Sequence, residues 1–254
     1  MVQGVVVTNF ITLSNASKEA FKTATLLKTL NVNSLITGED GVGKKSLASY
    51  ILPNATMVDA SDFDESLTTL NSTNQIILTN LHNSPNLNTI IETINSNDIR
   101  VVATSKEYLD NENLDELFSV KFSIPPLNQR EEDVVALIDM FSKEAIEIFG
   151  GESDFNSLDL TPDLSKNTIS LKRQVMINYL LQDVHDTELM GIIENYLSNK
   201  LGSNSDYRKF LYLYEVPLIK AGLKQFKSQL QLSDKLGLNR NTLRKKIADN
   251  KKYL

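Results

Sequence analysis

A glycine-rich segment between two apolar stretches constrains the fold of this chain more than any other feature. The sequence GEDGVGK at 38–44 follows the apolar run 34–37 and precedes a helical pattern at 44–51. It fits G-x-x-x-x-G-K between a strand and a helix, where backbone N–H groups and the helix N-terminus surround a phosphate. We therefore predict a nucleotide-binding loop made by Gly38, Gly41, Val42, Gly43, Lys44, Lys45 and Ser46.

Strand patterns alternate with helical patterns around this loop. Strands are predicted at Val5–Val7, 34–38, 57–60, 75–79, 100–104 and 120–124, and helices at 15–30, 44–51, 61–73 and 86–96. Such alternation is typical of a parallel sheet covered by helices on both faces. Only helical patterns follow, at 131–149, 171–184, 187–200, 207–226, 229–236 and 240–250, with a loop or weak helix at 150–168.

The strand at 75–79 lacks the acids that ATP hydrolysis requires. A hydrolytic P-loop site needs a strand that ends in a carboxylate for Mg²⁺, followed by an acid that acts on water. Here the strand ends in Thr79 and Asn80. We therefore assign no catalytic residue and expect ATP or ADP to be bound without hydrolysis. Two alternatives stay open: an empty loop retained from a nucleotide-binding ancestor, and a slow ATPase, with His82 as an ordinary loop residue or a substitute base.

Composition excludes several classes of site. The chain has no cysteine and two histidines, His82 and His185, so disulfides and thiolate metal sites are excluded and we expect no metal centre. The net charge of −6 is unevenly distributed, because residues 217–254 carry ten Lys or Arg against two acids. A basic segment on an acidic chain suggests that a polyanion is bound at one end only.

The basic segment has the pattern of a helix-turn-helix. Ser228 is a predicted cap for the helix 229–236, Gly237 suits a tight turn, and Asn239 is a predicted cap for the helix 240–250. Leu243 and Ile247 fall on the inward face of this last helix. The outward face is predicted to bind double-stranded DNA, through Arg240, Asn241, Thr242, Arg244, Lys245 and Lys246, with Ser228 and Asn239 beside it.

Two resemblances follow from these motifs. The sequence NRNTLRKKI at 239–247 resembles the recognition helix of the Fis family, and the likeness reaches back to about Asp186. It implies a homodimer formed through the helices 188–201 and 207–226, and it implies that Ser228 contacts a backbone phosphate. Residues 13–185 resemble the AAA+ domain of NtrC-like activators of sigma-54 RNA polymerase, at LITGEDGVGKK (35–45), RVVATS (100–105) and PPLNQREEDV (125–134). The weaker match LKRQV (171–175) implies a nucleotide-binding role for Arg173.

Several departures from the NtrC-like family bear on function. The span from Asp59 to Gln75 is too short for the loop by which these activators hold sigma-54. Ser105 stands at the sensor I asparagine position, the arginine-finger region before Pro125 is missing, and Arg130 alone remains downstream. No sensory domain precedes residue 13 in this sequence.

We therefore expect an α/β P-loop (AAA+-like) parallel sheet with a small helical lid, followed by an all-α Fis-type helix-turn-helix domain. The expected domains are a degenerate AAA+ subdomain at 1–130, a lid at 131–185 and a dimerisation and DNA-binding domain at 186–254. The expected function is bacterial, cytoplasmic and nucleoid-associated transcription regulation without sigma-54 remodelling, with no membrane partner. The alternative is a partner or antagonist of a complete NtrC-like activator; such an activator or RNA polymerase is then the expected protein partner.

Overall fold

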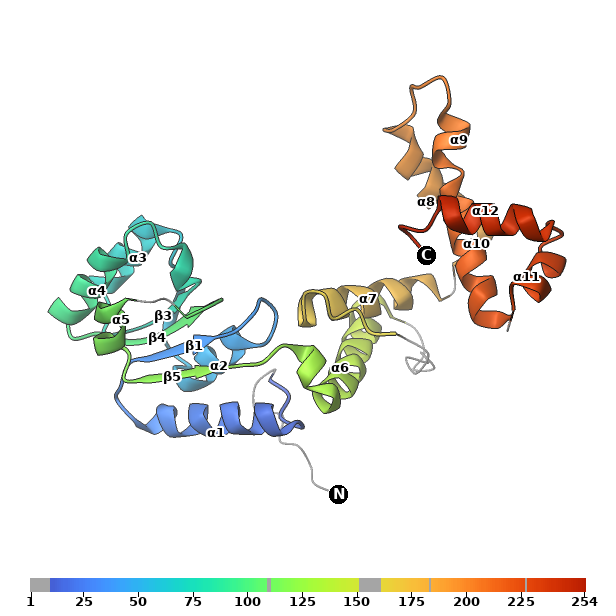
Figure 1. The fold of residues 1–254 in the computed structure, drawn as a ribbon. Helices are drawn as coiled ribbons and strands as arrows, with labels where there is room; N and C mark the ends of the chain where they lie inside the picture. Colours follow the sequence, from blue (N-terminus) through green and yellow to red (C-terminus); the bar gives the residue numbers. More distant parts are fainter. Residues whose placement is uncertain (1–9, 109–110, 151–160, 183, 227) are drawn as a thin grey trace. The chain divides into compact units, whose positions relative to one another are not determined.

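The computed structural model describes residues 10–108, 111–150, 161–182, 184–226 and 228–254 (Figure 1). The chain divides into two compact units, residues 1–183 and 184–254. The predicted strand Val5–Val7 and residues 151–160 of the predicted loop lie outside the described residues.

Five parallel strands form one sheet in the first unit, in the order β2-β3-β4-β1-β5. They are β1 (Ser34–Thr37), β2 (Thr56–Asp59), β3 (Gln75–Thr79), β4 (Arg100–Ser105) and β5 (Val120–Ser123). In the register, Leu35 of β1 pairs with Ala103 of β4 and with Lys121 of β5. The parallel sheet predicted from residues 34–124 is thus confirmed, and the glycine-rich loop leaves β1 at the carboxyl edge, between the ends of β4 and β5.

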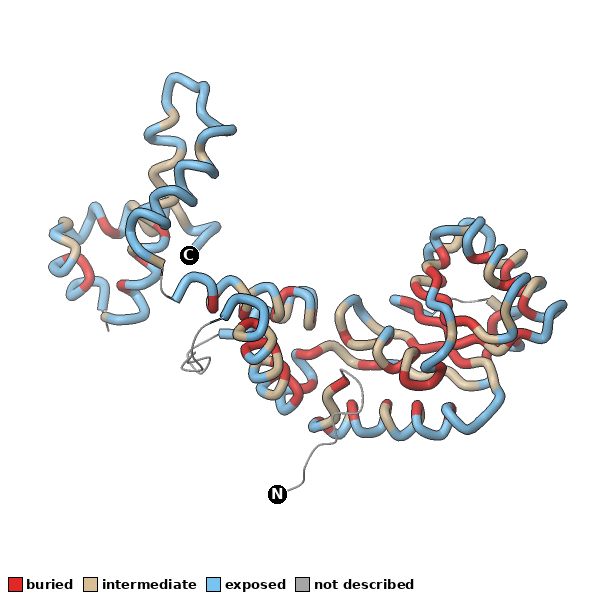
Figure 2. Tube along the Cα trace, turned by 180° about the vertical axis from the view of Figure 1, so that it is seen from behind, coloured by how far each residue is buried: buried red, intermediate tan, exposed pale blue. Residues whose placement is uncertain are grey.

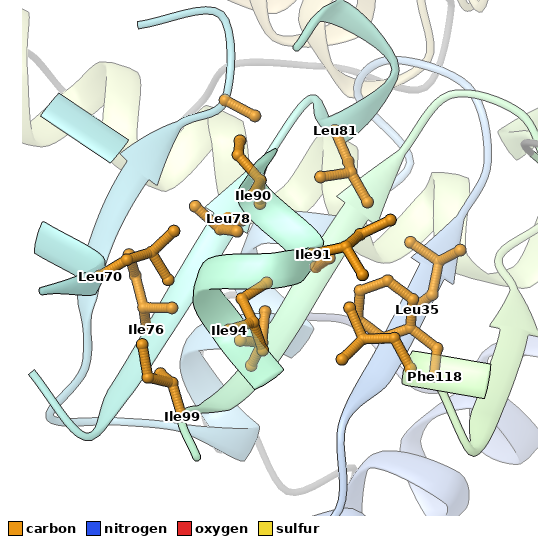
Figure 3. Packing of buried hydrophobic residues seen from close by; sticks show 14 of the residues in the cluster. Leu35, Leu70, Ile76, Leu78, Leu81, Ile90, Ile91, Ile94, Ile99 and Phe118 are labelled. Carbon is orange, nitrogen blue, oxygen red and sulfur yellow. The ribbon is translucent and has the colours of Figure 1, made fainter. Parts of the chain in front are cut away.

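Helices cover both faces of this sheet because successive strand side chains point to opposite sides. Ile76 and Leu78 of β3 pack with α3 (Phe63–Leu70), α4 (Leu87–Ser96) and α5 (Glu112–Leu117). Ile77 packs instead with α1 (Asn15–Thr29) and α2 (Lys44–Ile51). Figure 3 shows the first of these clusters, with three isoleucines of α4 lying over the strands: Ile90, Ile91 and Ile94. The sequence analysis did not predict α5, which is only six residues long.

A pair of helices follows the sheet. The short 3₁₀ turn η2 (Leu127–Gln129) leads into α6 (Glu131–Phe149), which packs against α7 (Thr168–Leu181). Their shared core contains Val134, Leu137, Phe141, Leu171 and Val175.

The second unit contains five described helices: α8 (Asp186–Ser198), α9 (Asp206–Phe210), α10 (Tyr212–Gln225), α11 (Gln229–Lys235) and α12 (Arg240–Asp249). Its core is small, with Ile219, Leu232 and Leu243 as the buried members. The single helix predicted at 207–226 is divided at Leu211 into α9 and α10. No residue of α8 is buried, as the pale tube in Figure 2 shows.

None of the helices within the described ranges combines the length and the hydrophobicity that crossing a membrane requires.

Candidate functional site

The loop between β1 and α2 has a backbone that only glycine-rich sequence adopts easily. Its three glycines have φ values of +142° (Gly38), +79° (Gly41) and +106° (Gly43). A Cβ on Gly41 would lie 2.6 Å from the carbonyl oxygen of Lys166. Gly41 therefore permits both the turn of the loop and the close approach of the segment before α7.

The backbone donors of this loop are unused. The N–H groups of residues 41–46 donate to no acceptor in the part of the chain that the structure describes. They include the first three N–H groups of α2, where the helix end carries a partial positive charge. Free donors in a glycine-rich loop at a helix N-terminus are the kind of groups that bind phosphate in proteins.

Lys44 is held inside the loop. Its side chain is 7% exposed, and Nζ donates to the carbonyl oxygens of Gly38 at 2.5 Å and Glu39 at 2.8 Å. Burial lowers the pKa of the Lys44 ammonium, and the charges of Lys106 and Lys45 lower it further, against the opposing carboxylates of Asp40 and Glu39. A phosphate would offer this buried ammonium a stronger partner than two neutral carbonyls.

A cavity of about 390 Å³ lies against the loop. Asn80 after β3 and Thr104 at the end of β4 line it from the sheet, and Thr168 and Ile169 line it from α7. The loop contributes Asp40, Gly41, Gly43, Lys44, Lys45 and Ser46. The β3 end thus contributes an amide where a hydrolytic site needs an acid.

Thr168 and Asn167 fasten α7 to the loop. The Thr168 N–H and Oγ1 both donate to the carbonyl oxygen of Gly41, at 3.2 and 2.6 Å. Nδ2 of Asn167 donates to the carbonyl oxygen of Asp40 at 2.9 Å and its Oδ1 accepts from the Leu127 N–H at 2.7 Å. Asn167 is buried at φ +52° and ψ −128°, a costly conformation for a residue with a side chain. The surrounding bonds therefore impose its position, and they attach the start of α7 to the loop.

No protein-family model matches the sequence, and no curated protein matches it. Among solved structures, NtrX from Brucella abortus matches 94% of this chain and 68% of its own, with TM-score 0.62 and 17% identity. The same protein in complex with ATP matches with TM-score 0.59 and 16% identity, over 95% of this chain and 69% of that chain. Its complex with ADP gives TM-score 0.59 and 17% identity, over 93% of this chain and 67% of that chain.

The first unit has an AAA+-like P-loop fold. The likeness to NtrX is a likeness of fold, since the sequence identity is low.

Arg173 is exposed on α7 and does not line the loop cavity. It lines a second cavity of about 800 Å³, together with Gly43 and Ser46 of the loop and with residues of α6. The structure thus brings Arg173 to the neighbourhood of the P-loop of this AAA+-like unit, but it does not place Arg173 beside the Lys44 ammonium.

Three residues at the site were not singled out by sequence. Asp59 ends β2, and its Oδ2 accepts from Nδ2 of Asn80 at 2.6 Å. Burial raises the pKa of Asp59, but hydrogen bonds from Ser61 and Asn80 and the Lys45 charge outweigh it and hold the pKa below its usual range. The other two are Lys106 and Asn167. The only available signal for Asp59 was an acid at the end of a predicted strand, since nothing local indicated that β2 lies beside β3.

The predicted recognition helix α12 presents its polar side to solvent. Leu243 is fully buried and Ile247 packs beside it, whereas the exposed residues are Arg240, Asn241, Thr242, Arg244 and Lys245. Gly237, at φ +62°, makes the turn between α11 and α12. Ser228 and Asn239 cap the two helices, with Oγ accepting from the Gln231 N–H at 3.2 Å and Oδ1 accepting from the Asn241 N–H at 2.9 Å.

Lys246 differs from its neighbours on α12. Its ammonium donates to Oε1 of Glu215 on α10. The side chains of Lys246 and Glu215 are 29% and 16% exposed. This pair ties the middle of α12 to α10, so Lys246 is engaged within its own unit.

An apolar groove of about 680 Å³ runs along α8, α9 and α10. Leu189, Ile193 and Leu197 line it from α8, and Phe210 and Leu218 line it from α9 and α10. Contiguous exposed apolar side chains of this kind are typical of an interaction surface.

Proposed function

We propose that this chain is a sequence-specific, dimeric DNA-binding transcriptional regulator whose AAA+-like domain binds ATP or ADP without hydrolysing it. The observation that carries the proposal is the exposed polar side of α12, which follows a glycine turn and is anchored by the buried Leu243. A helix of this size and composition fits the major groove of DNA.

The first test concerns base recognition by α12. Genome-wide mapping of bound DNA identifies a binding site, and fluorescence anisotropy on that site then compares variants. Arg240→Ala together with Arg244→Ala should weaken specific binding by about 1–3 kcal/mol for each arginine that pairs with a base in the wild type. The control Lys220→Ala with Lys224→Ala removes two exposed charges from α10 and should lower specific and non-specific binding alike. Specific affinity within twofold of the wild type in the double arginine variant would refute DNA recognition by α12.

The groove on α8–α10 supports a second copy of this chain as the partner. The second unit has only a small core of its own, and dimerisation would bury the exposed face of α8. Sedimentation of the full chain should show a dimer, and Ile193→Asp in the groove should give monomers. Ile192→Asp is the control, because Ile192 is exposed on α8 but does not line the groove. A wild-type chain that stays monomeric at high concentration would contradict this part of the proposal.

Nucleotide binding without turnover is supported by the free loop donors and by the neutral residues at the end of β3. ATP or ADP should raise the thermal unfolding midpoint of the first unit, and Lys44→Ala should abolish the shift. No shift at millimolar nucleotide would end the nucleotide proposal.

The second candidate, a slow ATPase, is favoured by one observation, the Asp59 carboxylate beside Asn80. Single-turnover measurement decides it: phosphate release that disappears in Lys44→Ala would establish the enzyme.

Action without sigma-54 remodelling is supported by the segment between β2 and β3. This segment is fully described and contains one helix, α3, of eight residues. The sigma-54-binding loop of the resembled family has no counterpart there. Transcription of a bound promoter should therefore respond to this chain in a strain that lacks sigma-54.

A further inference from the structure

The lining of the P-loop pocket is poor in ligands for Mg²⁺. In P-loop NTPases, Mg²⁺ is held by the Ser or Thr after the loop lysine and by an Asp at the end of a neighbouring strand. Here Lys45 follows Lys44, and β3 ends in Thr79 and Asn80. The lining contains two lysines and a single carboxylate, Asp40, which is 59% exposed and lies 4.0 Å from the Lys44 ammonium.

Asp59 does not supply the missing ligand. Its Oδ1 accepts from the Ser61 N–H at 3.1 Å and the Ser61 Oγ at 2.8 Å, and its Oδ2 accepts from Asn80. In the described ranges, no group of three or more His, Asp or Glu side chains is arranged to hold a metal ion. At a nucleotide site Mg²⁺ is held by one or two carboxylates together with phosphates and water. The lining offers only the exposed carboxylate of Asp40, which already lies against the Lys44 ammonium, so the residues present fit Mg²⁺ poorly.

Two lysines, Lys45 and Lys106, place positive charge near the loop instead. Lys45 lies in the first turn of α2, and Lys106 directly follows β4, the strand beside β1. Both side chains are exposed. Lys45 lines the pocket, and Lys106 stands two residues after Thr104 of its lining, so that the charges of both lysines lower the pKa of the buried Lys44 ammonium. The Lys106 backbone is held in place, since its N–H donates to Nδ1 of His82 at 3.2 Å.

We infer that this pocket binds the phosphates of a nucleoside di- or triphosphate without Mg²⁺, with Lys45 and Lys106 neutralising the charge that the metal neutralises elsewhere. The inference rests on the proposed nucleotide binding and adds the chemical form of the ligand. An ammonium group is a compact point charge that can pair with phosphate oxygens. Bound Mg²⁺, by contrast, would meet the like charge of Lys45, at the position where P-loop NTPases place a hydroxyl ligand.

Calorimetric titration of the full chain tests this directly. ADP and ATP are titrated in excess EDTA and in excess Mg²⁺, at one ionic strength of about 0.1 M because exposed lysines are screened by salt. The expected Kd in EDTA is within threefold of the Kd in Mg²⁺. Binding that weakens more than threefold without Mg²⁺ overturns the inference and leaves the proposed nucleotide binding intact. No binding in either buffer overturns both.

Variants of Lys45 and Lys106 test whether these two lysines neutralise the charge of the phosphates. Lys45→Ser with Lys106→Gln should weaken binding in EDTA, by roughly fivefold for each charge removed. Lys22→Gln, an exposed lysine on α1, should leave the Kd unchanged. Thermal unfolding of each variant reports its folding, and the wild-type comparison stands without the variants. A double variant that is folded and binds in EDTA like the wild type overturns the roles of Lys45 and Lys106.

Discussion

Breaking the buried ion pair between Arg130 and Asp133 is predicted to destabilise the first unit strongly. Nε of Arg130 donates to Oδ2 of Asp133 at 2.7 Å, and the two side chains are 2% and 0% exposed. Asp133 also accepts from the N–H groups of Leu13 and Ser14 and from the hydroxyls of Ser14 and Ser17. Asp133→Ala would therefore leave a buried guanidinium without a counter-ion and would remove the acceptor from the start of α1.

The expected destabilisation follows from that geometry. Removing one partner of a buried ion pair costs about 3–5 kcal/mol, because the remaining charge is neither paired nor solvated. Replacing both partners by apolar residues, Arg130→Met with Asp133→Leu, removes the orphaned charge. The double variant should therefore lose less stability than Asp133→Ala alone.

The destabilisation is measured by unfolding the variants in urea, with hydrogen exchange at the amides of α1 and α6 as the readout. A local reporter is needed because the two units can unfold separately. Glu132→Ala, an exposed neighbour on the same helix turn, should change the free energy of unfolding by less than about 0.5 kcal/mol. A destabilisation below about 1 kcal/mol for Asp133→Ala, or a double variant less stable than the single one, would refute this reasoning.

The same pair makes a prediction about pH. Burial raises the pKa of Asp133, but hydrogen bonds from Ser14 and Leu13 and the Arg130 charge outweigh it, so the pKa in the folded state is lowered. The stabilisation is therefore fully present above the unfolded pKa of about 3.9 and is lost as pH falls through the folded value. The stability difference between the wild type and Asp133→Asn should shrink as pH is lowered from about 5 to 3. A difference that stays constant over this range would contradict the prediction.

Four further substitutions test the packing around the two sites. A Cβ on Gly222 would collide with Leu232 of α11, so Gly222→Ala should destabilise the second unit by about 1–3 kcal/mol in thermal unfolding. A Cβ on Gly191 would meet open space, so Gly191→Ala should stabilise α8 by about 0.5–1 kcal/mol. Glu215→Gln breaks the ion pair that ties α12 to α10; it should reduce specific DNA binding more than non-specific binding, and equal reductions would contradict a positioning role. Asn167→Ala removes the bonds between α7 and the loop; it should speed amide exchange in α7 and weaken ADP binding, and unchanged exchange would show that α7 is held by other contacts.

Local patterns predicted most elements of the first unit. Consecutive apolar residues such as Ile76, Ile77 and Leu78 identify a strand buried on both faces, and the structure distributes them over two helical layers. The loop was predictable because its glycines and Lys44 are adjacent in sequence. Ser14 caps α1, with its Oγ accepting from the Ser17 N–H at 3.2 Å.

The partners of the loop were not predictable, because they depend on strand order and on packing between distant segments. Asp59 meets Asn80 only because β2 lies beside β3, and Lys106 acts on Lys44 only because β4 lies beside β1. Asn167 carries no sequence signal at all, since its positive φ is imposed by bonds to residues about 40 and 127 positions away. The residue type and spacing of Lys246 predicted a contact with DNA. Its ion pair with Glu215 follows only from the packing of α12 on α10.

These distant contacts give the loop a structural role that does not depend on acids at the end of β3. Arg130 donates from Nη1 to the carbonyl oxygen of Val42 at 3.0 Å, so the ion pair supports the loop, while Asn167 and Thr168 attach α7 to its other side. A nucleotide at the free N–H groups would thus tighten contacts among the loop, α1, α6 and α7 together. Occupancy at 100 times the Kd stabilises a fold by about 2.7 kcal/mol through mass action alone. That amount is comparable to the effect of breaking a buried ion pair, and it requires neither hydrolysis nor a metal.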